Sequence, residues 1–259
     1  MHGWLIYDKA SAEKNAWFIR RLIELAKENG LSLTLKTDED FSRLPDFALV
    51  RVIRPDINAK LEMAGVRVFN NAKTARIACD KWQTYLACKD LGVPVLPTAK
   101  TYTQEIGLPC IVKTVDGHGG AEVFLAQTGA EVARLQGVYE NTVVQKRGAV
   151  LGKDMRVYAI GGEIVAGVLR TSEKDFRSNF SLGGQVRLAQ ADELQKQIVK
   201  KLYENLAFDF VGVDFLPDGN GGWILNEIED SAGARMLYAT SDIDIAKLYI
   251  GYIKKQVCV

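Results

Sequence analysis

Residues 211–238, VGVDFLPDGNGGWILNEIEDSAGARMLY, contain the feature that decides the fold. Asp214 lies in one apolar, strand-like run, Glu227 and Glu229 lie in a second, and a turn rich in Pro, Asp, Asn and Gly separates the two. Because side chains alternate between the faces of a strand, Glu227 and Glu229 are expected on one face and Ile228 in the core. Asp214 can join the two glutamates from the neighbouring strand. The stretch therefore predicts a β-hairpin with three carboxylates on one face.

Three carboxylates on one face of a sheet repel one another unless a cation lies between them. Oxygen ligands with room for water suit Mg²⁺ that bridges the phosphates of a nucleotide. The alternative is a plain acidic hairpin face in contact with solvent, and the hairpin taken alone favours that simpler interpretation. The choice between the two depends on the rest of the chain.

The bulk composition is that of an ordinary globular protein. The chain has 259 residues, of which 47% are hydrophobic and 25% are charged, and its net charge is +1. The length suits two or three small lobes. With so little net charge, we expect neither nucleic acid nor a membrane surface as a partner, so any anion site must be a local arrangement.

Targeting segments and metal-binding cysteines are not expected. Residues 1–10, MHGWLIYDKA, lack the apolar core of a signal peptide, and no apolar run approaches the roughly 20 residues that span a bilayer. The four cysteines show no metal-ligand spacing, which predicts reduced thiols and a cytoplasmic location. Having only two histidines argues against a zinc site or a histidine-based triad. These residues are Cys79, Cys88, Cys110, Cys258, His2 and His118.

Strand and helix patterns alternate at short intervals in the first part of the chain, which predicts a small parallel α/β domain over residues 1–75. Two α+β lobes are expected after it, one over 76–145 and one over 146–259. The predicted strands are 3–7, 31–35, 47–52, 66–69, 109–114, 122–126 and 142–145, with a hairpin at 155–170. The predicted helices are 12–28, 58–64, 74–91, 129–136, 192–206 and 243–257.

A lysine at the end of an apolar strand runs into glycines in residues 111–120, IVKTVDGHGG. Glycines let backbone N–H groups approach phosphate oxygens, and Lys113 would hold the phosphates from the strand side. Neither a Walker motif nor a GxGxxG motif is present. The alternative is a glycine-rich hairpin with a surface lysine, in which His118 is a loop residue rather than a base. The glycines concerned are Gly117, Gly119 and Gly120.

Other polar residues fit contacts to a nucleotide, although a surface position explains each of them equally well when it is taken alone. Lys81 lies in the helix predicted at 74–91, and the strand 142–145 leads into a segment that can offer backbone groups to an adenine edge. Asp154 can accept hydrogen bonds from ribose hydroxyls. Guanidinium groups suit forked contacts to phosphate or carboxylate. The arginines in question are Arg156, Arg170 and, in the segment FRSNFSLGGQ (176–185), Arg177.

The order of these pieces is more specific than any one of them. It resembles the ATP-grasp superfamily, and in particular the branch of RimK-like carboxylate–amine ligases. The resemblance begins near FNNAKTARIACDKWQTYLACKDLGVPVLPT (69–98) and covers about residues 45–238, ending beyond the glutamate pair. The first 45 residues match only in type. The resemblance implies an ATP-grasp fold, in which a small α/β domain precedes two α+β lobes that enclose the nucleotide.

The resemblance also implies residue roles. Asp214, Glu227 and Glu229 match positions that bind Mg²⁺, for which Mn²⁺ is a substitute. Arg156 and Arg170 match catalytic arginines that steady the transferred phosphoryl group and the acyl phosphate. The residues that it assigns to ATP are Lys81, Lys113, Gly117, Gly119, Gly120, Gln145, Lys146, Arg147, Asp154, Arg177, Ser178 and Asn179.

The implied reaction is ATP-dependent amide formation between a small carboxylate and an amine, such as amino acids or a peptide, through an acyl phosphate. Arg235 is a candidate to clamp a substrate carboxylate, as are Arg51 and Arg54. Structural salt bridges are the alternative for all three, and for Arg51 we favour that alternative. Assembly into a homo-oligomer is also expected. Two other functions remain open: an ATP-binding regulatory module without ligase activity, and a phosphotransferase with the same fold.

The chain departs from the family pattern at two positions. The usual metal-binding pair is Glu-x-Asn, whereas here the second position is Glu229. A second carboxylate still binds Mg²⁺ through oxygen, but it adds negative charge beside the phosphates. The other departure is Lys146, at a position where an acidic residue is common. We therefore expect only backbone contacts to adenine there.

Overall fold

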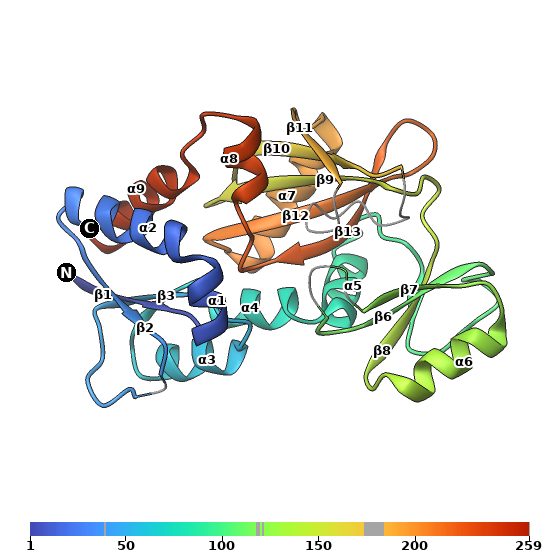
Figure 1. Ribbon diagram of the computed structural model, residues 1–259, viewed down its shortest axis with the longest axis horizontal. Helices are drawn as coiled ribbons and strands as arrows, with labels where there is room; N and C mark the ends of the chain where they lie inside the picture. The colour runs from blue at the N-terminus through green and yellow to red at the C-terminus, as the bar shows by residue number, and fades with distance from the viewer. Residues whose placement is uncertain (39, 118–119, 121, 174–183, 259) are drawn as a thin grey trace.

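The computed structural model describes residues 1–38, 40–117, 120, 122–173 and 184–258. Its three sheets follow one another along the chain (Figure 1). Several predicted site residues lie outside the described ranges: Gly119, Arg177, Ser178 and Asn179, together with His118. Within those ranges, no helix has the length and apolar character needed to cross a membrane. The four cysteines are free thiols, as predicted.

The first sheet is parallel, with strand order β2-β1-β3-β4, and it confirms the predicted small α/β domain. Helix α2 buries one apolar stripe that includes Phe18, Leu22 and Leu25, which gives the sheet a covered face. The elements are β1 (His2–Ile6), α1 (Lys9–Lys14), α2 (Ala16–Glu28), β2 (Ser32–Lys36), β3 (Phe47–Val50), α3 (Pro55–Met63) and β4 (Arg67–Phe69).

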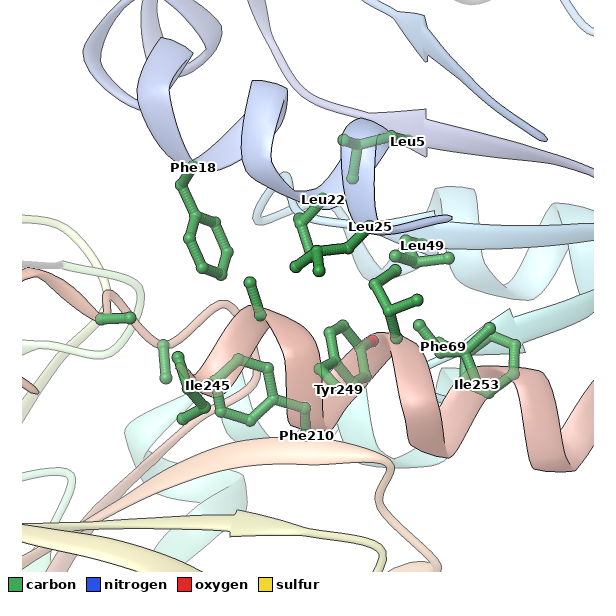
Figure 2. Packing of buried hydrophobic residues seen from close by; sticks show 14 of the residues in the cluster. Leu5, Phe18, Leu22, Leu25, Leu49, Phe69, Phe210, Ile245, Tyr249 and Ile253 are labelled. Atoms are coloured by element: carbon green, nitrogen blue, oxygen red, sulfur yellow. The ribbon is translucent and has the colours of Figure 1, made fainter. Parts of the chain in front are cut away.

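The last helix, α9 (Ile245–Val257), returns to this first domain and packs beside α2. Figure 2 shows Tyr249 and Ile253 of α9 in the same apolar cluster as Leu22 and Leu25 of α2. Phe210 reaches this cluster from the third sheet. Each such fully buried side chain contributes about 1.5–3 kcal/mol. The cluster therefore fixes the first domain against the C-terminal part of the chain.

Two helices replace the single helix predicted at 74–91: α4 (Ala72–Ala78) and α5 (Lys81–Asp90). The chain breaks at Asp80, whose extended backbone and side chain cap α5 by accepting hydrogen bonds from Trp82 N and Gln83 N, at 2.8 and 2.9 Å. The prediction of one continuous helix is therefore wrong. Lys81 begins a helix instead of lying inside one, and this places it beside the glycine loop of the second sheet.

The second sheet has the order β5-β8-β6-β7 and is antiparallel. Its elements are β5 (Thr98–Ala99), β6 (Cys110–Thr114), β7 (Val123–Ala126), α6 (Gly129–Val138) and β8 (Thr142–Lys146). The third sheet has the order β11-β10-β9-β12-β13 and is also antiparallel. Its elements are β9 (Lys153–Ile160), β10 (Glu163–Thr171), β11 (Gln185–Ala189), α7 (Glu193–Leu206), β12 (Phe210–Pro217), β13 (Trp223–Glu229) and α8 (Arg235–Thr240). Both predicted hairpins of this sheet are confirmed, whereas β11 and α8 were not expected.

Asn70 joins the first domain to the third sheet. Its side chain is 3% exposed, and its Oδ1 accepts hydrogen bonds from Asp209 N and Phe210 N, at 2.6 and 2.8 Å. Its Nδ2 donates to Phe210 O at 2.7 Å and to Asp230 O at 3.2 Å. The same amide therefore positions both the start of β12 and the residue that follows β13.

We predict that Asn70→Ala lowers the free energy of unfolding by about 2–4 kcal/mol, because it leaves buried peptide groups without partners. Equilibrium denaturation in urea measures the change. The matched control is Asn205→Ala, since Asn205 is exposed and its amide makes one bond, to Lys201 O. The control should change stability by less than about 0.5 kcal/mol. Equal losses in the two variants would contradict the assigned role.

Candidate active site

Side chains of the second and third sheets face each other across a cleft. One wall consists of residues from α5, the second sheet and its glycine loop, and the other consists of residues from β9, β10, β12 and β13. The polar residues of the first wall are Lys81, Lys113, Gly117, Gly120 and Gln145. Those of the second wall are Lys153, Asp154, Arg170, Asp214, Asn226, Glu227 and Glu229. The fold thus brings together predicted site residues that are more than 140 positions apart in sequence.

The two predicted lysines are buried and reach across the cleft. Lys81 Nζ forms an ion pair with Glu227 Oε1 at 3.1 Å and donates a hydrogen bond to Gly117 O. Lys113 Nζ donates to Asn226 Oδ1 at 3.4 Å. Burial lowers the pKa of Lys113 to about 8, and the nearby Lys81 ammonium acts in the same direction. The cleft therefore holds two ammonium groups opposite its acidic wall.

A hydrogen-bonded network of arginines and carboxylates supports the acidic wall. In the sheet register, Asp214 lies opposite Arg156 on β9, and Asp154 lies opposite Arg170 on β10. Arg156 binds both oxygens of Asp214 at 2.7 Å and Glu229 Oε1 at 2.6 Å. Arg170 Nη2 binds Asp154 Oδ2 at 2.6 Å and Asp214 Oδ2 at 2.8 Å. Asp214 therefore touches both guanidinium groups at once.

The carboxylates of this network differ in charge environment. Although burial opposes ionisation, the guanidinium groups of Arg156 and Arg170 hold the pKa of Asp214 well below its usual range. Burial raises the pKa of Glu229 in spite of its contact with Arg156. Asp214 thus stays ionised as a fixed anion, while Glu229 would gain most from an additional cation.

The hairpin of β12 and β13 contains a β-bulge next to the carboxylates. Asp214 pairs with Glu227 but Phe215 pairs with Leu225, so Asn226 is an extra residue. The predicted alternation of Glu227 and Glu229 about the buried Ile228 is confirmed. Strict alternation would put Asn226 on the opposite face, yet it also lines the cleft. Asn226 was not among the predicted site residues, because the sequence marks it only as a polar residue next to an apolar run.

The glycine loop is sterically restricted at Gly117. A Cβ at this position would lie 2.2 Å from Thr114 Oγ1 and 3.0 Å from Glu122 Oε2. Those two oxygens are already fixed, because Thr114 donates to Glu122 at 2.6 Å. Gly120 has a φ of +76°, which side-chain-bearing residues rarely adopt. Both positions therefore require glycine, as expected of a loop that brings its backbone close to a ligand.

The predicted adenine-binding segment divides into two parts. Gln145 lines the cleft, and its Nε2 donates to Thr98 Oγ1 at 3.2 Å. Lys146 and Arg147 are exposed and do not line the cleft, and the Lys146 N–H already donates to Pro97 O at 2.8 Å. The adjacent wall is apolar and suits a planar ring. It consists of Leu96, Ile111, Val123, Val150, Leu151 and Leu216.

The remaining arginine candidates lie outside this cleft. Arg156 is not part of the cleft lining and acts through the carboxylates that it holds. Arg235 is exposed at the start of α8, where its Nη2 donates to Lys14 O at 2.7 Å. Arg54 forms an exposed ion pair with Asp56 at 2.8 Å. Arg51 is buried, and the structure shows no ion pair for it among the described residues.

The donor set of the acidic wall fits a magnesium ion that also binds phosphate oxygens. In the described ranges, no three His, Cys, Asp or Glu side chains converge closely enough to form a complete metal cage. Mg²⁺ needs only one or two protein carboxylates when phosphates and water supply its other ligands. The side chain of Asp214 is 5% exposed and contacts two arginines, whereas those of Glu227 and Glu229 are 20% and 27% exposed and each contact one cation. The two glutamates are therefore the residues that would hold such an ion.

Comparison with known proteins identifies the family. Residues 95–253 match the RimK-like ATP-grasp domain. A probable alpha-L-glutamate ligase of Maridesulfovibrio salexigens is 30% identical over 211 residues, which cover 76% of this chain and 70% of that protein.

Solved structures show the same fold. The D-alanine–D-alanine ligase of Bacillus anthracis in complex with ATP superposes with a TM-score of 0.75 and 16% identity, covering 100% of this chain and 97% of the other. The ATP-grasp ligase PsnB in complex with a minimal precursor, Mg and ADP gives 0.73 and 16%, covering 99% and 97%. The chain therefore belongs to the RimK-like ATP-grasp family, as its sequence predicted, and is an enzyme of the ATP-dependent ligase class that forms carbon–nitrogen bonds.

Proposed function

We propose that this enzyme joins the carboxylate of one amino acid or peptide to the amine of another through an acyl phosphate. The observation that carries the proposal is the pair of buried lysines, Lys81 and Lys113, facing the acidic wall across one cleft. Among the described residues of the cleft lining there is no Ser, Cys or His that could act as nucleophile or base. The cleft is therefore suited to chemistry that proceeds by positioning and charge neutralisation.

The reaction has two steps. A carboxylate oxygen of the first substrate attacks the γ-phosphorus of ATP, the bond to the bridging oxygen breaks, and ADP leaves. The amine of the second substrate then attacks the acyl carbon, inorganic phosphate leaves, and the amine gives up a proton as the amide forms. Mg²⁺ held by Glu227 and Glu229 would supply positive charge to the phosphate oxygens.

The chain's own residues have the following proposed roles. Lys81 and Lys113 neutralise phosphate charge, and their burial strengthens this effect because little water screens it. Arg170 reaches the cleft and steadies the transferred phosphoryl group, whereas Arg156 positions Asp214 and Glu229 from behind. The glycine loop with Gly117, Gly119 and Gly120 covers the phosphates. Gln145 binds adenine beside the apolar wall and Asp154 binds ribose. For Arg177, Ser178 and Asn179 we keep the nucleotide-binding role that the family resemblance implies.

L-Glutamate is the amino acid that we propose as a first substrate, by analogy with the glutamate ligase relative. A screen for phosphate release tests this choice, with Mg·ATP and paired amino acids, dipeptides and small carboxylic acids. A ligase releases inorganic phosphate only when both substrates are present. An ATP-binding regulatory module releases none with any pair. A phosphotransferase yields a stable phosphorylated product instead.

We predict that Lys113→Met and Glu227→Gln each reduce ATP turnover at least about 100-fold, because each removes a charge that neutralises or anchors the phosphates. Coupled detection of ADP measures the rate, and the unfolding midpoint checks the fold. The control is Lys100→Met, because Lys100 is an exposed lysine of the same lobe, bonded to Asn141. The site assignment is wrong if Lys113→Met or Glu227→Gln retains near-normal turnover.

The pKa of Lys113 predicts a pH dependence of nucleotide binding. Burial places this pKa at about 8 in the free protein, so the lysine is charged below pH 8 and loses its proton as the pH rises through that value. Only the charged form attracts phosphate, and we expect the Kd for ADP to rise about 10-fold between pH 7 and pH 9. Calorimetric titration at constant Mg²⁺ measures this change. Lys113→Met should bind ADP weakly and without this rise, and an equal rise in that variant would contradict the role of Lys113.

A further inference from the structure

A second cavity, of about 270 Å³, lies between the first domain and the loop that follows β13. Its residues come from the ends of β1 and β3, from α1, and from positions 231 and 233. Ser231 is only two residues beyond Glu229, and two residues of chain span at most about 7 Å. The cavity is therefore separate from the nucleotide cleft but within the length of one amino acid of its acidic wall. It is lined by Tyr7, Asp8, Ser11, Asn15, Arg51, Val52, Ile53, Ser231 and Gly233.

Arg51 brings a buried positive charge to this cavity. The residue is 8% exposed, and its two hydrogen bonds go to neutral oxygens: Nη2 to Ala232 O at 2.8 Å, and Nε to the Tyr7 hydroxyl at 3.3 Å. Aromatic rings of Phe18 and Phe210 lie 5.6 and 5.4 Å from the guanidinium. No carboxylate of the described residues lies within 4.0 Å of it. The buried carboxyl of Asp230 acts on this guanidinium electrostatically without forming a direct ion pair with it. A buried guanidinium that has no directly bonded anion is suited to receive one.

Ser231 is an independent sign of a missing partner. The residue lines the same cavity, and its buried Oγ has no hydrogen-bond partner within the described part of the chain. Buried hydroxyls are nearly always paired, and such exceptions require an explanation. A carboxylate placed between Arg51 and Ser231 would accept hydrogen bonds from both. One bound carboxylate would thus supply both the hydrogen-bond acceptor that the Ser231 hydroxyl lacks and a direct anionic partner for Arg51.

The charge at the rim of the cavity favours a carboxylate over a phosphate. Asp8 also lines the cavity, and hydrogen bonding by the Ser11 side chain and by Ser11 N, at 2.8 Å, holds the pKa of Asp8 below its usual range. A fixed negative charge there repels a doubly charged phosphate more strongly than a carboxylate. It also attracts the ammonium group of a zwitterion. An amino acid carries both of these groups.

We propose that the Arg51–Ser231 cavity binds a free carboxylate of the amino-acid substrate, at a point remote from the bond being formed. This proposal rests on the ligase function proposed above and adds a substrate requirement to it. The carboxylate bound by Arg51 is not the one that reacts. The enzyme accordingly selects an amino acid whose second carboxylate is neither amidated nor esterified.

The probes are L-glutamate and its two monoamides, L-glutamine and L-isoglutamine. Calorimetric binding without ATP is measured for the wild type and for Arg51→Gln and Ser231→Ala. A charged hydrogen bond of this kind corresponds to a change in Kd of about 10- to 100-fold. We expect Arg51→Gln to weaken L-glutamate binding by that factor and Ser231→Ala to weaken it by a smaller factor. One monoamide should bind the wild type as weakly as L-glutamate binds Arg51→Gln.

Two comparisons separate this effect from damage to the fold. Arg54→Gln removes an exposed guanidinium three residues away, outside the cavity lining, and should bind L-glutamate like the wild type. Ser231→Ala leaves the internal contacts of Arg51 intact, so a loss in that variant cannot come from misplacement of Arg51.

The same variants distinguish failure of this proposal from failure of the ligase function. Suppose that L-glutamate supports ATP turnover and that Arg51→Gln and Ser231→Ala keep the wild-type KM: the cavity proposal is then overturned and the ligase function stands. If no turnover occurs with any pair but binding of L-glutamate still depends on Arg51, the cavity proposal stands and the ligase function fails. Equal binding of L-glutamate and both monoamides, or no binding of L-glutamate to the wild type, also overturns the cavity proposal.

Discussion

The contact of Asp214 with two buried arginines is the interaction on which the site depends. Arg156 and Arg170 are 5% and 3% exposed, and removing their common carboxylate would leave each buried guanidinium with one fewer anionic partner, Glu229 for Arg156 and Asp154 for Arg170. Within the strand order β10-β9-β12-β13, Arg170 of β10 pairs with Asp154 of β9, and Asp214 of β12 pairs with Arg156 of β9, so the contact connects three adjacent strands. Both carboxylate oxygens of Asp214 therefore already accept hydrogen bonds from arginines of the protein. Glu227 and Glu229, at the edge of the network, remain to face Lys81 and the cleft.

Sequence patterns predicted the fold where local and tertiary preferences agree. The parallel domain, both hairpins of the third sheet and the long α7 follow from apolar periodicity and turn residues. The predictions from sequence patterns failed where one side chain overrides the structure that the neighbouring residues favour. Asp80 ends a helical pattern that is otherwise continuous from α4 to α5, because its carboxylate caps the next turn. The packing of α9 against α2 joins residues over 200 positions apart and has no local signal.

Sequence order predicted which candidate residues come together better than it predicted their contacts. Lys81, Lys113 and Glu227 line one cleft, and a single strand pattern was enough to place Glu227 and Glu229 on one face. Asn226 could not be placed, because a bulge depends on the pairing of two strands. Nor could the sequence show that Arg51 would be buried without an ion pair, or that Arg235 would turn away to bind Lys14 O. Such outcomes depend on which helices cover which side chains.

Transfer of carboxylate oxygen to phosphate tests the acyl-phosphate route most directly. The carboxylate substrate found by the phosphate-release screen is labelled with ¹⁸O in both oxygens and converted to the amide with Mg·ATP. One carboxylate oxygen attacks phosphorus and leaves with it, so each molecule of inorganic phosphate should contain one ¹⁸O and each amide should retain the other. Mass spectrometry of the phosphate measures the label. Amide formation that releases only unlabelled phosphate would contradict the acyl-phosphate mechanism.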